Sequence, residues 1–139
     1  MAFWKRSVAK AQDRAPAPSA ALTTRLRGQA AEDRALAHLQ AAGLRLVERN
    51  YRTPGRGGGE IDLIAREPGG SLVFVEVRER AGDSRGGAAA SVSAAKQGRI
   101  VLAARHYLLR RHRTPPPCRF DVVAIDGERI EWIRGAFGV

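Results

Sequence analysis

Residues 59–65, with the sequence GEIDLIA, and residues 72–78, with the sequence LVFVEVR, are the two strand-forming runs that decide the fold of this chain. The segment between them, EPGGS at 67–71, is rich in turn residues and predicts a hairpin loop. A loop of this length that closes symmetrically places residue 66 opposite residue 72. We therefore expect these two runs to form an antiparallel pair of strands.

Each of the two strands carries an acid among apolar residues, Asp62 in the first and Glu76 in the second. The expected register sets them opposite each other, with Cβ atoms ~5 Å apart, where two like charges destabilise a sheet unless a cation lies between them. Mg²⁺ takes one or two carboxylates together with water and phosphate oxygens, so one interpretation is a metal site. The alternative is a pair of acids on a solvent-exposed sheet face, and a bulge near Pro68 would undo the pairing.

The same register sets Glu60 opposite Arg78, which predicts a plain cross-strand ion pair. The functional alternative is that Arg78 holds a scissile phosphate or the attacking water. A guanidinium does not deprotonate near neutral pH, so Arg78 could donate hydrogen bonds but could not act as a general base.

Two further charged residues lie on helical stripes that face inward. Glu32 has helical spacing with Leu36 and Leu39, so it needs a partner, which is a metal, a water or an arginine, unless it lies at the edge of the buried stripe. Lys96 has helical spacing with Ile100 and could orient or deprotonate a water, as arginine cannot. Its structural alternative is a lysine whose head reaches solvent.

Helix and strand signals along the remaining sequence predict an α+β domain with the order α-β-β-β-α-β-β. Capping residues, apolar periodicity and glycine or proline breaks set the expected boundaries. The predicted elements are a helix that starts at Thr23 or Thr24 and ends near Ala42, strands 44–51, 60–66 and 72–80, a helix 93–111, and strands 119–126 and 129–133.

Composition excludes several classes of protein. The chain has 139 residues and one cysteine, so no disulfide can form within it. Its longest apolar runs are far shorter than the ~18 residues that a transmembrane helix needs. Charges at Lys5 and Arg6 stand where a signal peptide would be apolar, so we expect a cytoplasmic protein.

The formal charge of +10 is distributed unevenly and predicts a polyanionic partner. Residues 1–27 are a basic segment rich in Ala and Pro, which we expect to be a disordered tail before a domain at 28–139. Residues 96–119 hold seven basic residues and no acid, whereas the proposed acidic ligands lie in 28–95. Nucleic acid is the partner that this charge favours; an arginine-rich proteome is the alternative explanation.

Four motifs in order resemble the YraN family of predicted nucleases: GEIDLIA at 59–65, FVEVRER at 74–80, SVSAAKQ at 91–97 and CRFDVV at 118–123. That family belongs to the restriction-endonuclease-like PD-(D/E)xK superfamily, near the archaeal Holliday-junction resolvases. The resemblance covers about 28–137. It implies a restriction-endonuclease-like α/β sandwich, with a mixed sheet flanked by helices.

The resemblance also implies a site. Asp62 and Glu76 would hold Mg²⁺ or Mn²⁺, with Glu32 as an additional helix-borne ligand. The catalytic lysine of the superfamily is replaced by Arg78, and Lys96 could supply the missing amine. The expected catalytic set is therefore Glu32, Asp62, Glu76, Arg78 and Lys96.

We expect a metal-dependent endonuclease that hydrolyses phosphodiester bonds in duplex, structured or branched DNA. Eight aromatic residues supply few stacking platforms for single strands. The resolvase-like relatives suggest a homodimer. One alternative is an inactive nucleic-acid-binding or scaffold protein that keeps the nuclease fold; another is a protein-interaction module whose tail binds an acidic partner. The residues expected to clamp phosphates are Arg80, Arg99, Arg105, Arg110 and Arg119.

Overall fold

The computed structural model describes residues 19–79 and 92–138 and shows a five-stranded sheet with two helices. The predicted order α-β-β-β-α-β-β is confirmed. Arg80 lies outside the described residues. The elements are α2 (Ala20–Ala41), β1 (Arg45–Arg52), β2 (Glu60–Arg66), β3 (Leu72–Glu79), α3 (Ala94–Arg111), β4 (Cys118–Asp126) and β5 (Arg129–Phe137).

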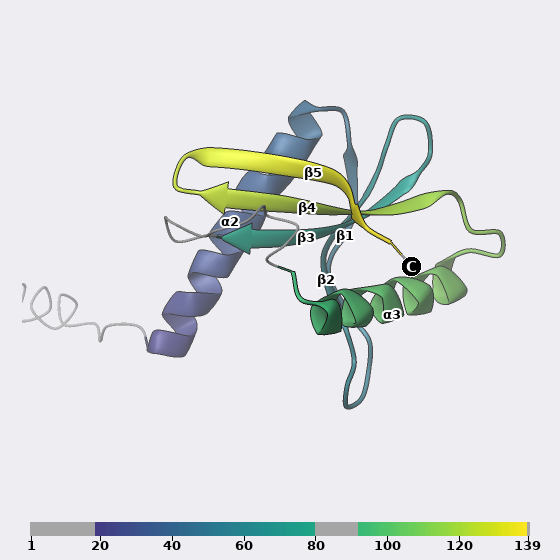
Figure 1. Ribbon diagram of the computed structural model, residues 1–139, viewed down its shortest axis with the longest axis horizontal. Helices are drawn as coiled ribbons and strands as arrows, with labels where there is room; N and C mark the ends of the chain where they lie inside the picture. The colour runs from purple at the N-terminus through teal and green to yellow at the C-terminus, as the bar shows by residue number, and fades with distance from the viewer. Residues whose placement is uncertain (1–18, 80–91, 139) are drawn as a thin grey trace, which may run out of the picture.

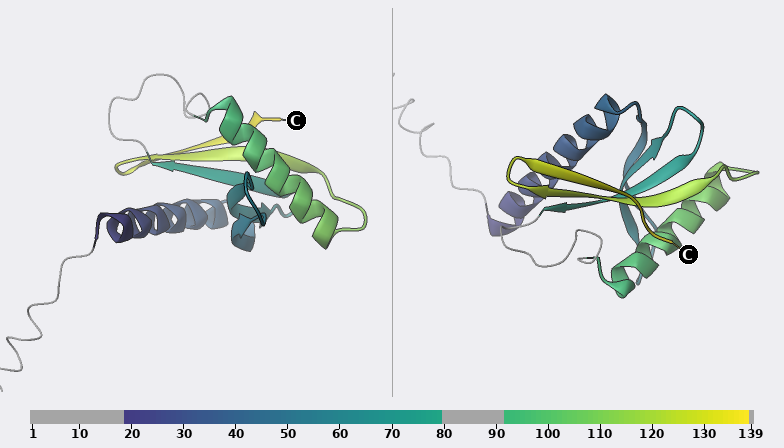
Figure 2. Two further views of the ribbon diagram at one scale, coloured as in Figure 1. Left: turned by 90° about the horizontal axis from the view of Figure 1, so that it is seen from below. Right: turned by 45° about the horizontal axis from the view of Figure 1, so that its top comes forward.

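The sheet is mixed, as expected, with the strand order β1-β2-β3-β4-β5. Its one parallel pair is β3 with β4, because α3 carries the chain back between them; the other neighbours are antiparallel. The two helices lie on opposite faces of the sheet (Figures 1 and 2). The domain is therefore a sandwich with the sheet as its middle layer.

Each helix covers its own apolar core. Under α3 the core contains Phe74 of β3 and Ile100 of the helix. Under α2 it contains Val75 of β3 and Leu39 of the helix. Because side chains alternate along β3, this strand supplies both cores and is buried on both faces.

Helix α2 starts earlier than its threonines predicted. Ser19 is the N-cap, and its hydroxyl accepts a hydrogen bond from the backbone N–H of Leu22. The predicted end of the tail at residue 27 thus falls inside α2, while residues 1–18 lie outside the described part of the chain. The predicted stop at Gly43 is confirmed: its φ is 100°, and Leu44 N–H bonds back to Leu39 O at 3.1 Å.

Helix α3 packs unusually close to the start of β2. Ser93 caps it, and its inward face buries Ile100, Ala104 and Tyr107. A Cβ on Gly59 would overlap the backbone carbonyl of Arg99, so only glycine fits at this position. The contact fixes the first turns of α3 over the start of β2.

Within the residues that the structure describes, no helix is both long and apolar enough to cross a membrane.

Strand β5 is longer than its apolar pattern predicted, since it continues past Ile133 to Phe137. A register shift relative to β4 and a left-handed Gly135 lie in this extension. That irregularity hid the end of the strand from a period-two pattern.

Candidate active site

The β2–β3 hairpin has the predicted register in the half next to its loop. Arg66 pairs with Leu72, and the ladder runs on to Leu63 opposite Val75. There the ladder ends, one step before the predicted pair of Asp62 and Glu76. No register shift interrupts it, so a bulge near the loop, the condition that would have undone the pairing, does not occur.

The Asp62 side chain replaces the next backbone hydrogen bond between β2 and β3. Its Oδ2 accepts a hydrogen bond from the backbone N–H of Val77 at 2.8 Å. The β2 strand changes face here, since Leu63 packs under α2 whereas Ile61 packs under α3. The Asp62 carboxylate thus fills the space that opens between the two strands.

Glu76 is buried, with 3% of its side chain exposed, and its carboxylate faces cations. Lys96 Nζ lies 3.3 Å from Glu76 Oε2, and Arg78 Nη1 lies 3.8 Å from the same oxygen. Lys96 reaches over from α3, whereas Arg78 follows on the same strand. The predicted inward position of Lys96 is therefore found, with the carboxylate of Glu76 as its partner.

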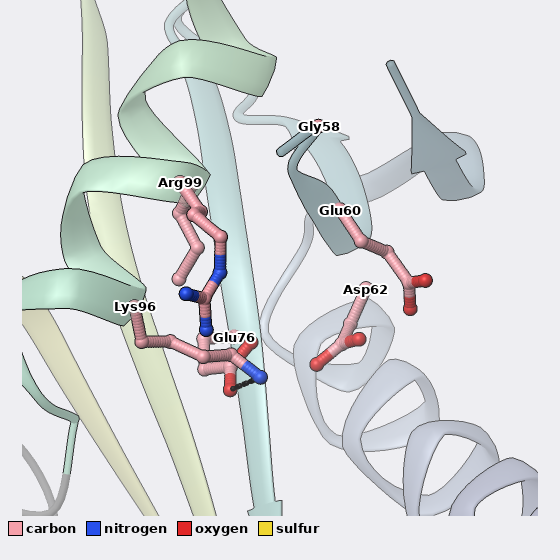
Figure 3. A pocket seen from close by; sticks show the side chains of 7 residues that line it. Gly58, Glu60, Asp62, Glu76, Lys96 and Arg99 are labelled. Carbon is pink, nitrogen blue, oxygen red and sulfur yellow. Dashed lines mark ion pairs between the residues drawn. The ribbon is translucent and has the colours of Figure 1, made fainter. Parts of the chain in front are cut away.

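Asp62, Glu76 and Lys96 line one cavity of about 180 Å³ between the start of α3 and strands β2 and β3. Figure 3 shows the carboxylates of Asp62 and Glu60 on one side of it and Lys96 and Arg99 on the other, with Glu76 between them. The lining residues are Gly58, Glu60, Asp62, Glu76, Lys96, Arg99 and Ile100.

Burial in this cavity and the negative charge of Glu76 together raise the pKa of Asp62 from 3.8 to about 7. The hydrogen bond from the Val77 N–H acts in the opposite direction and lowers it. A cation between the two carboxylates would favour the charged form of Asp62.

The donor set fits a hard divalent cation. Asp62 and Glu76 offer carboxylate oxygens, which Mg²⁺ prefers, and the ammonium of Lys96 already shows that Glu76 accepts a cation. Among the described residues, no three His, Cys, Asp or Glu side chains gather closely enough to hold a metal by themselves. A site here would therefore rest on two carboxylates, with water or substrate completing the shell.

Glu32 is near this pair but has its own partner. Arg49 of β1 reaches both Glu32 Oε1, at 3.2 Å, and Asp33 Oδ1, at 2.7 Å. Burial and the charge of Asp62 raise the pKa of Glu32, while hydrogen bonds from Arg49 and Asn50 oppose this. Of the partners left open for Glu32, the structure contains the arginine, and metal binding by Glu32 remains a prediction.

Glu60 forms a different ion pair from the one expected. Its Oε2 lies 2.6 Å from Arg52 Nε on β1. The described β2–β3 ladder does not reach the level at which Glu60 would face Arg78. The prediction was wrong because β2 turns away from β3 beyond Leu63, toward β1.

The described arginines among those expected to clamp phosphates lie in different surroundings. Arg99 lines the cavity, whereas Arg105 and Arg110 are exposed further along α3. Arg119 is engaged elsewhere, since it pairs with Glu67 and donates from Nε to Asp121 at 2.9 Å. Its position in the basic segment 96–119 did not reveal these acidic neighbours.

Asp121 is a residue whose importance sequence analysis missed. It is fully buried in β4 and accepts hydrogen bonds from Arg119, from Trp132 Nε1 at 2.8 Å and from Gly135 N–H at 2.9 Å. Its sequence signal, an acid inside an apolar strand, is the same as that of Asp62. Because protein donors satisfy it, Asp121 is structural and joins β4 to β5.

Comparisons with known proteins place these features in a family. The sequence model of the uncharacterised protein family UPF0102 matches residues 31–125, a span that includes Asp62, Glu76 and Lys96. A UPF0102 protein of Acidovorax sp. (strain JS42) is 70% identical over 117 residues, covering 84% of this chain and 88% of that protein. A UPF0102 protein of Polaromonas sp. (strain JS666 / ATCC BAA-500) is 55% identical over 147 residues, covering 99% and 98%.

Proposed function

The chain belongs to UPF0102, the YraN family of the restriction-endonuclease-like superfamily, and we propose that it is a Mg²⁺-dependent endonuclease acting on structured or branched DNA. The observation that carries the proposal is the position of Lys96. Its ammonium lies 3.3 Å from the buried Glu76, in the same cavity as Asp62. Two carboxylates that can hold a metal, with an amine beside them, suit metal-assisted phosphodiester hydrolysis.

Asp62 and Glu76 would hold the metal. The chemistry that bound Mg²⁺ adds is polarisation of a phosphate oxygen and acidification of a bound water. Asp62 is aimed by its bond from Val77, and Glu76 is held on a strand that is buried on both faces. Both oxygen donors therefore belong to rigid elements, which favours a fixed geometry at the reacting phosphate.

Lys96 would orient the attacking water. If Asp62 and Glu76 held a metal, the charge of Glu76 would be balanced without the ammonium, and Lys96 could turn toward a water or a phosphate oxygen. Arg78 stands 3.8 Å from the same Glu76 oxygen but keeps its proton near neutral pH. It can stabilise charge on the phosphate, whereas proton transfer falls to Lys96 or to solvent.

Basic residues at the cavity and further along α3 support a nucleic-acid substrate. Arg99 lines the cavity itself, and Arg105 is exposed on the same helix. Such contacts bind the backbone and carry little sequence information. Recognition would therefore depend on the shape of the DNA, with an affinity that falls steeply as salt rises.

The direct test uses the full chain with Mg²⁺ or Mn²⁺ and with linear, flapped and four-way-junction DNA of equal length. We expect cleavage that Asp62→Asn, Glu76→Gln and Lys96→Ala each reduce by at least a hundredfold. Glu131→Gln, an exposed carboxylate on β5, is the matched control and should cleave as wild type. Cleavage that survives Asp62→Asn would contradict the proposal.

A second candidate is a DNA-binding protein without nuclease activity. Arg78 in the lysine position favours it, since both Arg78 and Lys96 already neutralise Glu76 in the absence of a metal. Lys96→Arg separates the two candidates because it keeps the charge but removes the amine. If the wild type cleaves DNA and Lys96→Arg loses cleavage with unchanged DNA affinity, the endonuclease is supported. If the wild type binds DNA tightly without cleaving it, the binding protein is supported.

A further inference from the structure

Asn50, the one asparagine of the chain, has a left-handed backbone in the middle of β1. Its φ is 52°, and among the described residues no other residue except glycine has a positive φ. Asparagine tolerates this region better than most residues, yet the interior of a strand does not call for it. Strained backbone conformations of this kind cluster at active sites and ligand-binding sites.

Strand β1 changes face at Asn50. Arg49, just before it, reaches Glu32 on α2, whereas Tyr51, just after it, packs under α3, where its ring lies 5.2 Å from that of Tyr107. In a regular strand, residues two apart share a face. The left-handed residue between them therefore rotates the strand so that its neighbours point to opposite layers.

Strand β2 changes face at the matching position. The ladder pairs Arg49 with Leu63 and Tyr51 with Ile61, which puts Asn50 beside Asp62. Leu63 packs under α2 and Ile61 under α3. The two strands thus turn together, and the turn occurs at the row that holds the candidate metal ligand.

Strand β3 does not take part in this rotation. Val75 and Val77 both pack on the α2 side, as regular alternation requires. Beyond Leu63, β2 therefore separates from β3, and the backbone N–H of Val77 is left to the carboxylate of Asp62. The separation also opens the space that the cavity occupies.

The side chain of Asn50 points to the same region. It lines a second cavity, of about 340 Å³, together with Glu32 and Glu60, and Glu60 also lines the first. The Asn50 side chain also lies close enough to Glu32 to lower the pKa of that carboxyl. One residue therefore contacts both the strand that carries Asp62 and the helix-borne acid.

We propose that Asn50 is a positioning residue of the acidic site. Its left-handed backbone turns β1 and β2 so that Asp62 reaches Val77 and Glu76, and its amide holds Glu32 beside them. The proposal rests on the proposed function in one respect only, namely that Asp62 and Glu76 serve to bind a metal. The placement of Asp62 itself can be measured without any metal.

The first experiment follows amide hydrogen exchange of Val77 relative to Val75 by NMR in the metal-free full chain. Asn50→Val forbids the left-handed backbone, so we expect the ratio of Val77 to Val75 exchange rates to rise at least tenfold. Asn50→Gly retains that backbone and should leave the ratio unchanged. An unchanged ratio in Asn50→Val would overturn the proposal.

Gly127→Val is the matched control. Gly127 has φ 60° in the distant β4–β5 turn, with open space around it, so valine imposes the same backbone strain there. This variant should raise the exchange of Val77 and Val75 together. A tenfold rise of the ratio in the control would show that Val77 reports general destabilisation and would also overturn the proposal.

The second experiment measures Mn²⁺ affinity by calorimetry. Asn50→Gly keeps the fold but loses the amide, and we expect about tenfold weaker binding, the usual effect of removing a group that orients a ligand. Wild-type affinity in this variant would overturn the role of the amide. If the wild type binds no Mn²⁺, the proposed function fails, whereas the Val77 ratio still decides the positioning role of Asn50.

Discussion

Asp62→Asn should stabilise the metal-free protein at pH 8 although it removes a native carboxylate. Burial and the charge of Glu76 raise the pKa of Asp62 from 3.8 to about 7, so the folded state binds this proton more tightly than the unfolded state. The resulting stabilisation is complete below about pH 4 and is lost as pH rises through about 7. Asparagine has no such loss, and its amide oxygen can still accept the Val77 N–H.

The size of the effect follows from the shift of about three pKa units. At ~1.4 kcal/mol per unit, the variant should exceed the wild type in free energy of unfolding by up to ~4 kcal/mol at pH 8. Near pH 5.5 the difference should be roughly 2 kcal/mol, and near pH 4 close to zero. The gain saturates above pH 8, because the Asp62 carboxyl is then fully ionised in both states.

Urea unfolding in EDTA between pH 4 and 8 measures this difference directly. Glu131→Gln, which neutralises an exposed carboxylate on β5, serves as the control and should follow the wild type at each pH. A difference between Asp62→Asn and wild type that stays constant from pH 5 to 8 would refute the argument from burial. Adding Mg²⁺ at a hundred times its dissociation constant should stabilise the wild type by ~2.7 kcal/mol and leave Asp62→Asn unchanged.

Three further predictions concern packing and charge. Gly59→Ala should cost ~3 kcal/mol in thermal unfolding, because the new Cβ overlaps the backbone of Arg99; a loss below ~1 kcal/mol would contradict the close approach of α3. Asp121→Ala should cost at least ~3 kcal/mol in urea unfolding, since it leaves buried donors and the charge of Arg119 without their acceptor, while Mn²⁺ affinity stays at the wild-type value. Arg99→Gln should weaken DNA binding and reduce the slope of log affinity against log salt by about one, whereas Arg119→Gln should destabilise the fold and leave that slope unchanged.

The sequence predicted most helices and strands correctly because apolar periodicity and turn residues can be read from a few neighbouring positions. Alternating apolar residues and the turn EPGGS at 67–71 are sufficient to predict β2, β3 and their register from Arg66–Leu72 to Leu63–Val75. Helical spacing placed Lys96 on an inward stripe. Where the prediction failed, at the start of α2 and the end of β5, a capping serine and a bulge set the boundary, and neither belongs to an apolar period.

The sequence predicted which residues form the candidate site better than it predicted how they are arranged. Asp62 and Glu76 stood out as acids within apolar strands, and the structure brings both into one cavity. Their expected relation, side by side in a regular ladder, assumed that β2 stays flat. The local face change beside Asn50 replaces that rung with a bond from Val77 to the Asp62 carboxylate.

The sequence by itself determined which residues are acids or amines on strands and helices, because period and residue type are local properties. The tertiary structure alone decided the partners: Lys96 for Glu76, Arg49 for Glu32, and Glu67 for Arg119. These contacts depend on how α3 crosses the sheet and how far its strands rotate. Both are set by packing between segments far apart in the chain, so no window of sequence contains them.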